Sequence, residues 1–256
     1  GLDARVRGTL VHDTFRFFWE AIQSQERLLA LSESELSAAI EAAIDKAIER
    51  AAREREQTLK GLFREIESQR LTTLLRQWLE VEKRRAPFSL QMAERKTVLR
   101  FGGLELHGYI DRVDTLANGS SVIIDYKTGQ PRTKDWQGDP PDEPQLPAYA
   151  TGREPPLPVS ALLFAALKPG RDFGFKGLAA DEGIAPKVEV TEGWDAQLDA
   201  WKTTLDKLAG DFRRGDARVD PREFPRTCDH CGLQALCRVH EQGIAPVESD
   251  AENGDD

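Results

Sequence analysis

The sequence predicts an α/β (α+β) protein in which helices flank a mixed central β-sheet. Three observations support this fold class. Apolar residues recur every three or four positions through the first third of the chain, which is typical of amphipathic helices. Short β-branched runs separated by glycine-containing turns follow from about Met92. The run VSALLFAAL, residues 159–167, is nearly all apolar and is typical of a strand covered on both faces.

The helical part is expected to span residues 1–90. Residues 5–31 carry apolar side chains at helical spacing and predict one amphipathic helix. The stretch SESE that follows fits a capping box, with Ser32 as the N-cap and Glu35 three residues later. Two further helices are expected after it, and the second ends before Pro87.

The sheet is expected to occupy residues 91–225. The runs RKTVLRF, LELHGYIDRVDTL and SVIIDYKT predict an antiparallel meander. A loop rich in proline, glycine and aspartate leads to a short helix that begins with QLPAYA, and another helix is expected over roughly 194–214. A cysteine module at 226–240 closes the fold, so residues 1–246 form one domain, and an acidic disordered tail occupies 247–256.

The composition is that of an ordinary globular protein of 256 residues, with 39% hydrophobic and 31% charged residues. A net charge of −9 argues against a broad basic surface, although it leaves room for a local basic groove. No apolar run reaches the roughly 18 residues that a membrane helix needs, so no membrane partner is expected. The chain opens within patterned sequence, which leads us to expect a piece of a longer protein.

The second and third of the predicted strands carry acids where a core is expected: Asp111 in one, and Asp125 with Lys127 in the other. A two-residue turn at 118–119 would send Asp111 to the opposite face from Asp125. A three-residue loop at 117–119, with Gly119 as its left-handed residue, would instead pair Asp111 with Asp125. We favour the three-residue loop because it also places Val122, Ile124 and Tyr126 together on the other face.

Two carboxylates this close repel each other unless a cation lies between them. Hard oxygen ligands suit Mg²⁺ or Mn²⁺ better than zinc. Lys127 beside them could neutralise charge that develops on a phosphate or orient an attacking water. The alternative is a solvent-facing strand with salt-bridged charges, which fits an otherwise apolar hairpin poorly.

These residues resemble a known family. GYIDRVD with Asp111, followed by DYKTG with Asp125 and Lys127, is similar to the catalytic core of the PD-(D/E)XK nuclease superfamily, in its RecB-like branch. The likeness extends to RGTLVH at 7–12 and QLPAY at 145–149, so matching motifs span most of the chain. The resemblance implies a PD-(D/E)XK nuclease core and a C-terminal nuclease domain like that of AddB.

The resemblance also implies a role for each matching residue. His12, Asp111, Asp125 and the backbone carbonyl of Tyr126 would bind the catalytic Mg²⁺ or Mn²⁺, and Lys127 would assist the nucleophilic water. Gln145 and Tyr149, four residues apart and therefore on one helix face, would lie near the DNA and the active site. Glu94 is expected to precede the first strand, where relatives often have an acid.

The three cysteines, Cys228, Cys231 and Cys237, lie within one ten-residue window. Their spacing fits zinc or an iron–sulfur cluster better than a disulfide framework. Zinc completed by His230 or His240, an empty module and a disulfide remain alternatives. The resemblance to AddB-like nucleases implies a [4Fe–4S] cluster in the full-length protein, completed by a cysteine upstream of this sequence.

Together these observations predict a metal-dependent deoxyribonuclease, with exonuclease action expected and endonuclease action left open. The resemblance implies the C-terminal part of a DNA repair or recombination protein that works with a helicase in the cytoplasm, at the nucleoid. Two alternatives are a catalytically silent DNA-binding or scaffolding relative and a single-strand nuclease of the CRISPR-adaptation type. A local rim of cations is expected to bind the DNA phosphates: Arg5, Arg7, Arg16, Arg132 and Lys134.

Overall fold

The structure is a computed structural model that describes residues 2–54, 59–229 and 231–241. Its contacts divide the chain into two compact units, Gly1–Gly210 and Asp211–Asp256. The acidic tail expected at 247–256 lies outside the described residues. No helix within the described ranges is both long enough and apolar enough to cross a membrane.

The first unit is built on a six-stranded mixed sheet with the strand order β1-β2-β3-β4-β5-β6. Strands β1, β2 and β3 form an antiparallel meander, and β4 then pairs with β3 in parallel after a crossover. Strand β5 is antiparallel to β4, and β6 is parallel to β5. The strand bounds are β1 Phe88–Phe101, β2 Leu104–Leu116, β3 Ser121–Lys127, β4 Val159–Ala166, β5 Gly174–Ala179 and β6 Glu189–Val190.

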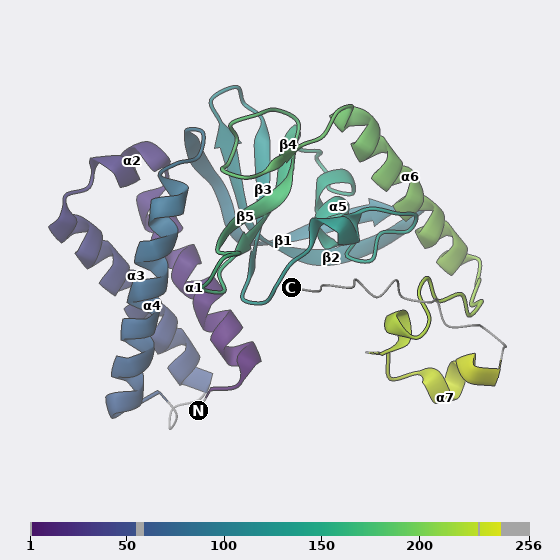
Figure 1. Ribbon diagram of the computed structural model, residues 1–256, viewed down its shortest axis with the longest axis horizontal. Helices are drawn as coiled ribbons and strands as arrows, with labels where there is room; N and C mark the ends of the chain where they lie inside the picture. The colour runs from purple at the N-terminus through teal and green to yellow at the C-terminus, as the bar shows by residue number, and fades with distance from the viewer. Residues whose placement is uncertain (1, 55–58, 230, 242–256) are drawn as a thin grey trace, which may run out of the picture. The chain divides into compact units, whose positions relative to one another are not determined.

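Helices cover both faces of this sheet, which confirms the predicted fold class (Figure 1). Alternate residues of β3 and β4 enter two separate apolar clusters, one packed against the N-terminal helices and the other against α5 and α6. All of β4 is buried, as its continuous apolar sequence predicts. The main helices are α1 Ala4–Ile22, α2 Gln25–Ala30, α3 Glu33–Glu54, α4 Gly61–Glu82, α5 Gln145–Thr151 and α6 Trp194–Arg213.

The prediction of one helix over residues 5–31 is wrong. Gln23 takes a left-handed conformation with φ 69°, which ends α1, and Ser24 caps α2 through a 3.2 Å bond from Arg27 N. The break lets the chain pair with β1, because Ser24 bridges Ser89 and Gln23 O accepts a bond from Leu90 N. The predicted capping box is confirmed: Ser32 N donates to the Glu35 carboxylate at 2.8 Å and Glu35 N donates back to Ser32 Oγ at 3.3 Å.

The register favoured for the β2–β3 hairpin is also confirmed. Arg112 pairs with Ile124 and Asp114 with Val122, so residues 117–119 form the loop and Asp111 falls opposite Asp125. Gly119 has φ +83°, a conformation that side chains rarely adopt. Val122, Ile124 and Tyr126 therefore share the face packed against the N-terminal helices.

The first strand begins earlier than predicted, and the last two strands were missed. Strand β1 starts at Phe88 rather than near Met92, because Phe88 already pairs with Leu116 at the end of β2. Strand β5 carries polar and glycine residues that hide the alternation of apolar and polar side chains typical of a strand. Gly177 is needed there because a Cβ at this position would lie 2.1 Å from Leu162 O of β4.

A fully buried ionic network lies between α4 and β2. Arg112 donates to Glu82 at 2.7 Å and to both oxygens of Asp114, and Arg85 donates to the same two carboxylates. All four side chains are at most 1% exposed. The Arg112 guanidinium also stacks 4.0 Å from the centre of the Trp19 ring. Two cations thus balance two anions in a site from which water is excluded.

Candidate active site

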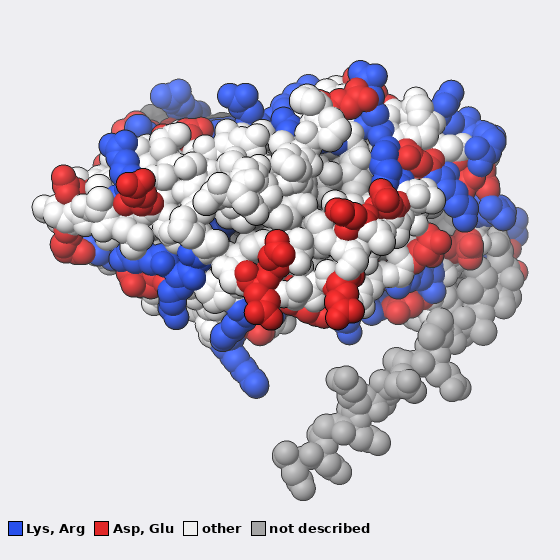
Figure 2. Space-filling model, turned by 90° about the horizontal axis from the view of Figure 1, so that it is seen from above, with Lys and Arg blue, Asp and Glu red and all other residues white. Residues whose placement is uncertain are grey.

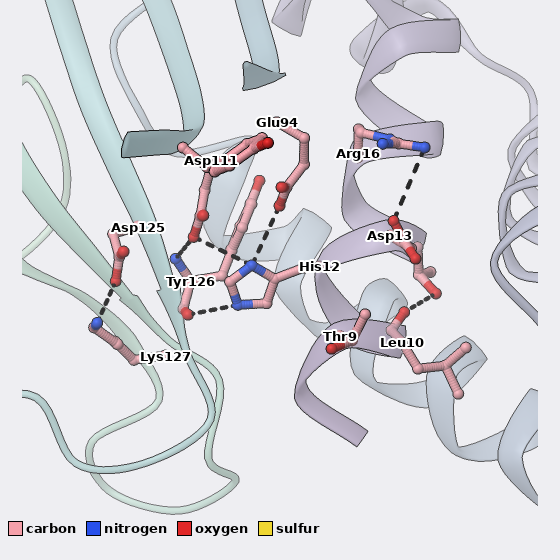
Figure 3. Close-up of polar contacts among 12 residues, drawn as sticks. Thr9, Leu10, His12, Asp13, Arg16, Glu94, Asp111, Asp125, Tyr126 and Lys127 are labelled. Atoms are coloured by element: carbon pink, nitrogen blue, oxygen red, sulfur yellow. Dashed lines mark hydrogen bonds and ion pairs between the residues drawn. The ribbon is translucent and has the colours of Figure 1, made fainter. Parts of the chain in front are cut away.

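Four elements deliver polar side chains to one place, where β3 ends beside the middle of β1 and β2 (Figure 3). Helix α1 supplies His12, β1 supplies Glu94, β2 supplies Asp111, and β3 supplies its last three residues, 125–127. The antiparallel register explains the meeting of the strands, because Ala93 pairs with Arg112 on one side and Ile124 pairs with Arg112 on the other. Helix α1 packs across this part of the sheet and turns His12 toward it.

Oxygen atoms surround the His12 ring on both sides. Its Nδ1 lies 3.3 Å from Glu94 Oε1 and 3.3 Å from Asp111 Oδ2, and its Nε2 donates to Tyr126 O at 3.0 Å. Burial lowers the pKa of His12, but Asp111 and Glu94 outweigh burial and raise that pKa to about 10. The backbone N–H of Tyr126 donates to Asp111 Oδ2 at 2.8 Å. These oxygens form an anionic cage around the His12 ring.

Asp125 and Lys127 form a second charged pair beside the cage. Lys127 Nζ lies 2.9 Å from Asp125 Oδ2, and it also donates to Gln145 Oε1 at 3.2 Å. Among the described residues, the buried Asp125 Oδ2 has no hydrogen-bond donor besides this ion pair. Burial and the neighbouring Asp111 charge raise the pKa of Asp125 to about 6, although Lys127 opposes them.

Gln145 and Tyr149 continue the polar chain that begins at Lys127. Both lie on one face of α5, where Gln145 Nε2 donates to Tyr149 OH at 3.4 Å and Tyr149 OH donates to Tyr109 O at 2.8 Å. The ring of Tyr149 packs against the bare Cα of Gly108, where a Cβ would come within 2.6 Å of the ring. Gly108 therefore lets α5 approach β2 and hold Gln145 against Lys127.

The buried ionic network supports the other side of the site. Arg112 NH1 donates to the Tyr126 hydroxyl at 3.2 Å, while the backbone of the same tyrosine contacts His12 and Asp111. Tyr126 is 3% exposed, and its ring centre lies 4.8 Å from that of Phe15 of α1, with the ring planes tilted by 59°. Tyr126 is thus fixed at both ends, which holds its carbonyl in place.

The residues present fit a divalent cation. Within the described ranges, His12, Glu94 and Asp111 form the single group of three or more His, Cys, Asp or Glu residues whose ligand atoms all lie within 4.8 Å of one another. Asp125 is not part of that group, but its buried Oδ2, which has no contact with a donor besides the ion pair with Lys127 among the described residues, could also accept a cation. Carboxylate and carbonyl oxygens with one imidazole suit Mg²⁺ or Mn²⁺.

Sequence reasoning placed Glu94 before the first strand, and that placement is wrong. Glu94 lies inside β1, opposite Asp111 in the register, and its carboxylate completes the group of three. Its φ of +46° is left-handed, which is uncommon for any residue but glycine and rarer still within a strand. The register shift between Leu90 and Met92 precedes this strained residue. Such strain is typical of a functional position.

Replacing Glu94 with glycine should give a more stable protein than replacing it with alanine, by about 1 kcal/mol. Both variants lose the carboxylate, so their difference in urea-unfolding free energy reports the backbone alone. At Lys96, two residues along the same strand, the order should reverse, because there alanine is the better strand residue. An alanine variant at position 94 as stable as the glycine variant would contradict the strain.

The cations expected to bind phosphate do not form one surface. Arg7 lies 3.7 Å from Glu67, Arg16 lies 3.8 Å from Glu20, and Arg132 pairs with Asp135 at 2.9 Å, while Arg5 and Lys134 are exposed. On the face shown in Figure 2, lysines and arginines are interspersed with acidic residues around a broad uncharged area.

The second unit contains the cysteines. Cys228 ends a short 3₁₀ helix, Arg226–Cys228, and Cys237 ends α7, Gln234–Cys237. All three cysteines are free, which overturns the disulfide alternative. Among the described residues they do not form a group at metal-binding distances. His230 and the side chain of His240, the alternative zinc ligands, lie outside the described part of the chain.

Comparison with known proteins identifies one family. The family described as the PD-(D/E)XK nuclease superfamily matches residues 1–238, which is most of the chain. No curated protein matches the sequence. The matched range contains every residue of the site described above.

Proposed function

Because the chain belongs to the PD-(D/E)XK nuclease superfamily, we propose that it is a metal-dependent deoxyribonuclease of the RecB-like branch. The superfamily consists of nucleases that use divalent metals, so a nuclease acting on DNA is the general expectation. The branch, the reaction and the residue roles are our proposal. The observation that carries it is the oxygen cage around His12, with the buried Asp125–Lys127 ion pair beside it.

The proposed metal ligands are His12, Asp111, Asp125 and the Tyr126 carbonyl, and we add Glu94 because its carboxylate lies with the first two. A bound Mg²⁺ or Mn²⁺ would offset phosphate charge and make a coordinated water more acidic. The protein's own contribution is to hold these oxygens in place. Arg112 fixes the Tyr126 ring, and the Tyr126 N–H fixes the Asp111 carboxylate.

Lys127 is the proposed partner of the attacking water. Burial lowers the pKa of Lys127, but Asp125 outweighs burial and raises it, so the amine stays charged at neutral pH. A charged amine orients a water molecule by donating to the lone pairs of the water oxygen, and it stabilises negative charge on the phosphate. Gln145 holds Nζ from the other side, and Tyr149 holds Gln145, so both are proposed as residues that position Lys127 near the DNA.

The cysteine module is proposed to hold a [4Fe–4S] cluster in the full-length protein, with a fourth cysteine supplied from elsewhere in the chain. The close sequence spacing and the free thiols of Cys228, Cys231 and Cys237 support this role. A brown protein with visible absorption after anaerobic purification would support the cluster. A colourless protein with bound zinc would contradict it.

The proposed biological role rests on the resemblance to the RecB-like branch. We propose exonuclease action in DNA repair or recombination, with a helicase as partner, in the cytoplasm at the nucleoid. The nuclease domain would extend over residues 1–246, with the cysteine module as its last part. Free thiols fit a reducing compartment.

The test is cleavage of end-labelled single-stranded and duplex DNA with Mg²⁺, with Mn²⁺ and with EDTA. The proposal expects cleavage with either metal and none with EDTA. DNA binding without cleavage in the full-length protein would favour the alternative, a silent DNA-binding relative.

A further inference from the structure

Two adjoining hollows lie beside the site, within the first unit. The nearer has a volume of about 560 Å³ and the farther about 820 Å³. They share Gln77 and Pro169, so one leads into the other. Helix α4 forms one wall of both, and the segment that joins β4 to β5 forms the other. We call the pair the α4 groove.

The nearer hollow of the α4 groove lies close to the active site. The nearer hollow is lined by Val11, which directly precedes His12 in the chain, and by Thr128, which directly follows Lys127. The backbone joins the same parts, because Leu167 N donates to Lys127 O at 2.8 Å and Leu167 also lines the hollow. The near end of the groove is therefore formed by residues adjacent in the chain to His12 and Lys127.

Positive charge dominates the lining of the α4 groove, in contrast with the net charge of −9 of the whole chain. Four lysines or arginines line the farther hollow and three line the nearer one, against two carboxylates. Both carboxylates are already paired, Glu80 with Lys83 at 2.6 Å and Asp172 with Lys176 at 3.2 Å. The groove cations are Arg7, Arg70, Arg84, Lys168, Arg171, Lys176 and Lys187.

Most of these cations are available to a ligand. Arg84, Lys168, Arg171 and Lys187 are exposed, and in the described part of the chain none of them pairs with a carboxylate. Arg70 pairs with Glu67 through Nε, but its NH2 is buried without an acceptor. Exposed cations without a carboxylate partner, such as the first four, suit phosphate oxygens.

The groove also offers apolar surface between the cations. Phe173 is half-buried in the lining, with its ring held at 5.6 Å against Trp78, and Pro169 and Leu74 lie near it. Aromatic and apolar surface between cations is the pattern that holds single strands, since unpaired bases stack while phosphates meet the charges. The bases of a duplex are stacked and paired inside it, so they could not reach this floor.

We propose that the α4 groove binds single-stranded DNA and guides one strand to or from the active site. This deepens the proposed function and rests on it, because that function supplies DNA as the substrate. Phosphates would contact Arg84, Arg171 and Lys187 in the farther hollow and Lys168 in the nearer one. Phe173 would support a base.

The test is the affinity for fluorescein-labelled oligothymidine of about 20 nucleotides, measured by anisotropy in EDTA, so that no cleavage is needed. The groove variant combines Arg171→Gln with Lys187→Gln. The control combines Lys46→Gln with Lys207→Gln, which removes the same charge from exposed positions on α3 and α6. The groove variant should bind about tenfold more weakly at low salt, and the slope of log K against log salt should be smaller by about 1.4, because two charges are removed.

The outcomes separate this inference from the proposed function. Equal affinities for the groove variant and the control would overturn the groove, whether or not the protein cleaves DNA. An equal loss for a duplex of the same length would overturn the single-strand assignment. Groove-dependent binding by a protein that fails to cleave with Mg²⁺ or Mn²⁺ would support the groove and contradict the hydrolytic function. With cleavage, the groove variant should raise KM about tenfold and leave kcat within about twofold.

Discussion

Replacing Asp111 with asparagine should lower kcat for DNA cleavage by about 10³-fold or more. The carboxylate lies against the His12 ring and accepts the Tyr126 N–H, so it belongs to the centre of the oxygen cage. Asparagine keeps the shape of the side chain and an oxygen for the Tyr126 hydrogen bond, but it loses the negative charge that a divalent cation requires. The fold should therefore survive while metal binding fails.

The matched control for this variant is Asp181→Asn, which removes the same charge from an exposed loop residue. The control should cleave at the wild-type rate, and both variants should unfold thermally within a few degrees of the wild type. An Asp111→Asn protein that retains cleavage within about tenfold of the wild type would contradict a catalytic role for Asp111.

Replacing Glu82 with glutamine should destabilise the protein by about 3–5 kcal/mol, because it leaves two buried guanidinium groups with one carboxylate. Urea unfolding at pH 7 measures the loss. The matched control is Glu65→Gln, an exposed change on the same helix, which should alter stability by no more than about 0.5 kcal/mol. A Glu82→Gln protein as stable as the control would mean that the network contributes nothing.

Glu82 should also make the stability of the folded protein depend on pH. Burial raises the pKa of Glu82, but Arg112 and Arg85 outweigh burial, and the net effect is a pKa below the ordinary 4.5. A carboxyl group with a lower pKa in the folded state stabilises that state above its unfolded pKa. This stability is lost as pH falls from about 4.5 through the folded pKa. The wild type should lose stability in that range, and the Glu82→Gln variant should lose less.

The sequence carries enough information for much of the hairpin and the helices. Gly119 in a three-residue loop determines the β2–β3 register, because one glycine supplies the left-handed conformation and one register keeps the apolar stripe on the core face. The Ser32–Glu35 capping box correctly predicts where α3 begins. These features depend on residues close together in the chain.

Features that depend on distant segments were not predicted. The helical spacing of apolar residues runs on through Gln23 and Ser24 to Leu28, so the sequence gives no sign of the break between α1 and α2. The break depends on the pairing of Ser24 with Ser89, which is distant in the chain. Glu94 lies in a polar stretch of β1, and its left-handed φ follows from the register of the folded sheet. The α4 groove takes its cations from segments far apart in sequence, and of these only Arg7 was among the cations expected to bind phosphate.

The most direct test of the central claim, that these residues bind a divalent cation, is an anomalous difference map from crystals containing Mn²⁺. We expect one strong peak within coordination distance of His12, Asp111, Asp125 and the Tyr126 carbonyl oxygen, and no peak there in crystals of the Asp111→Asn variant. Mn²⁺ found elsewhere on the protein, with the His12 ring still held between Glu94, Asp111 and the Tyr126 carbonyl, would contradict the metal site and the hydrolysis assigned to it.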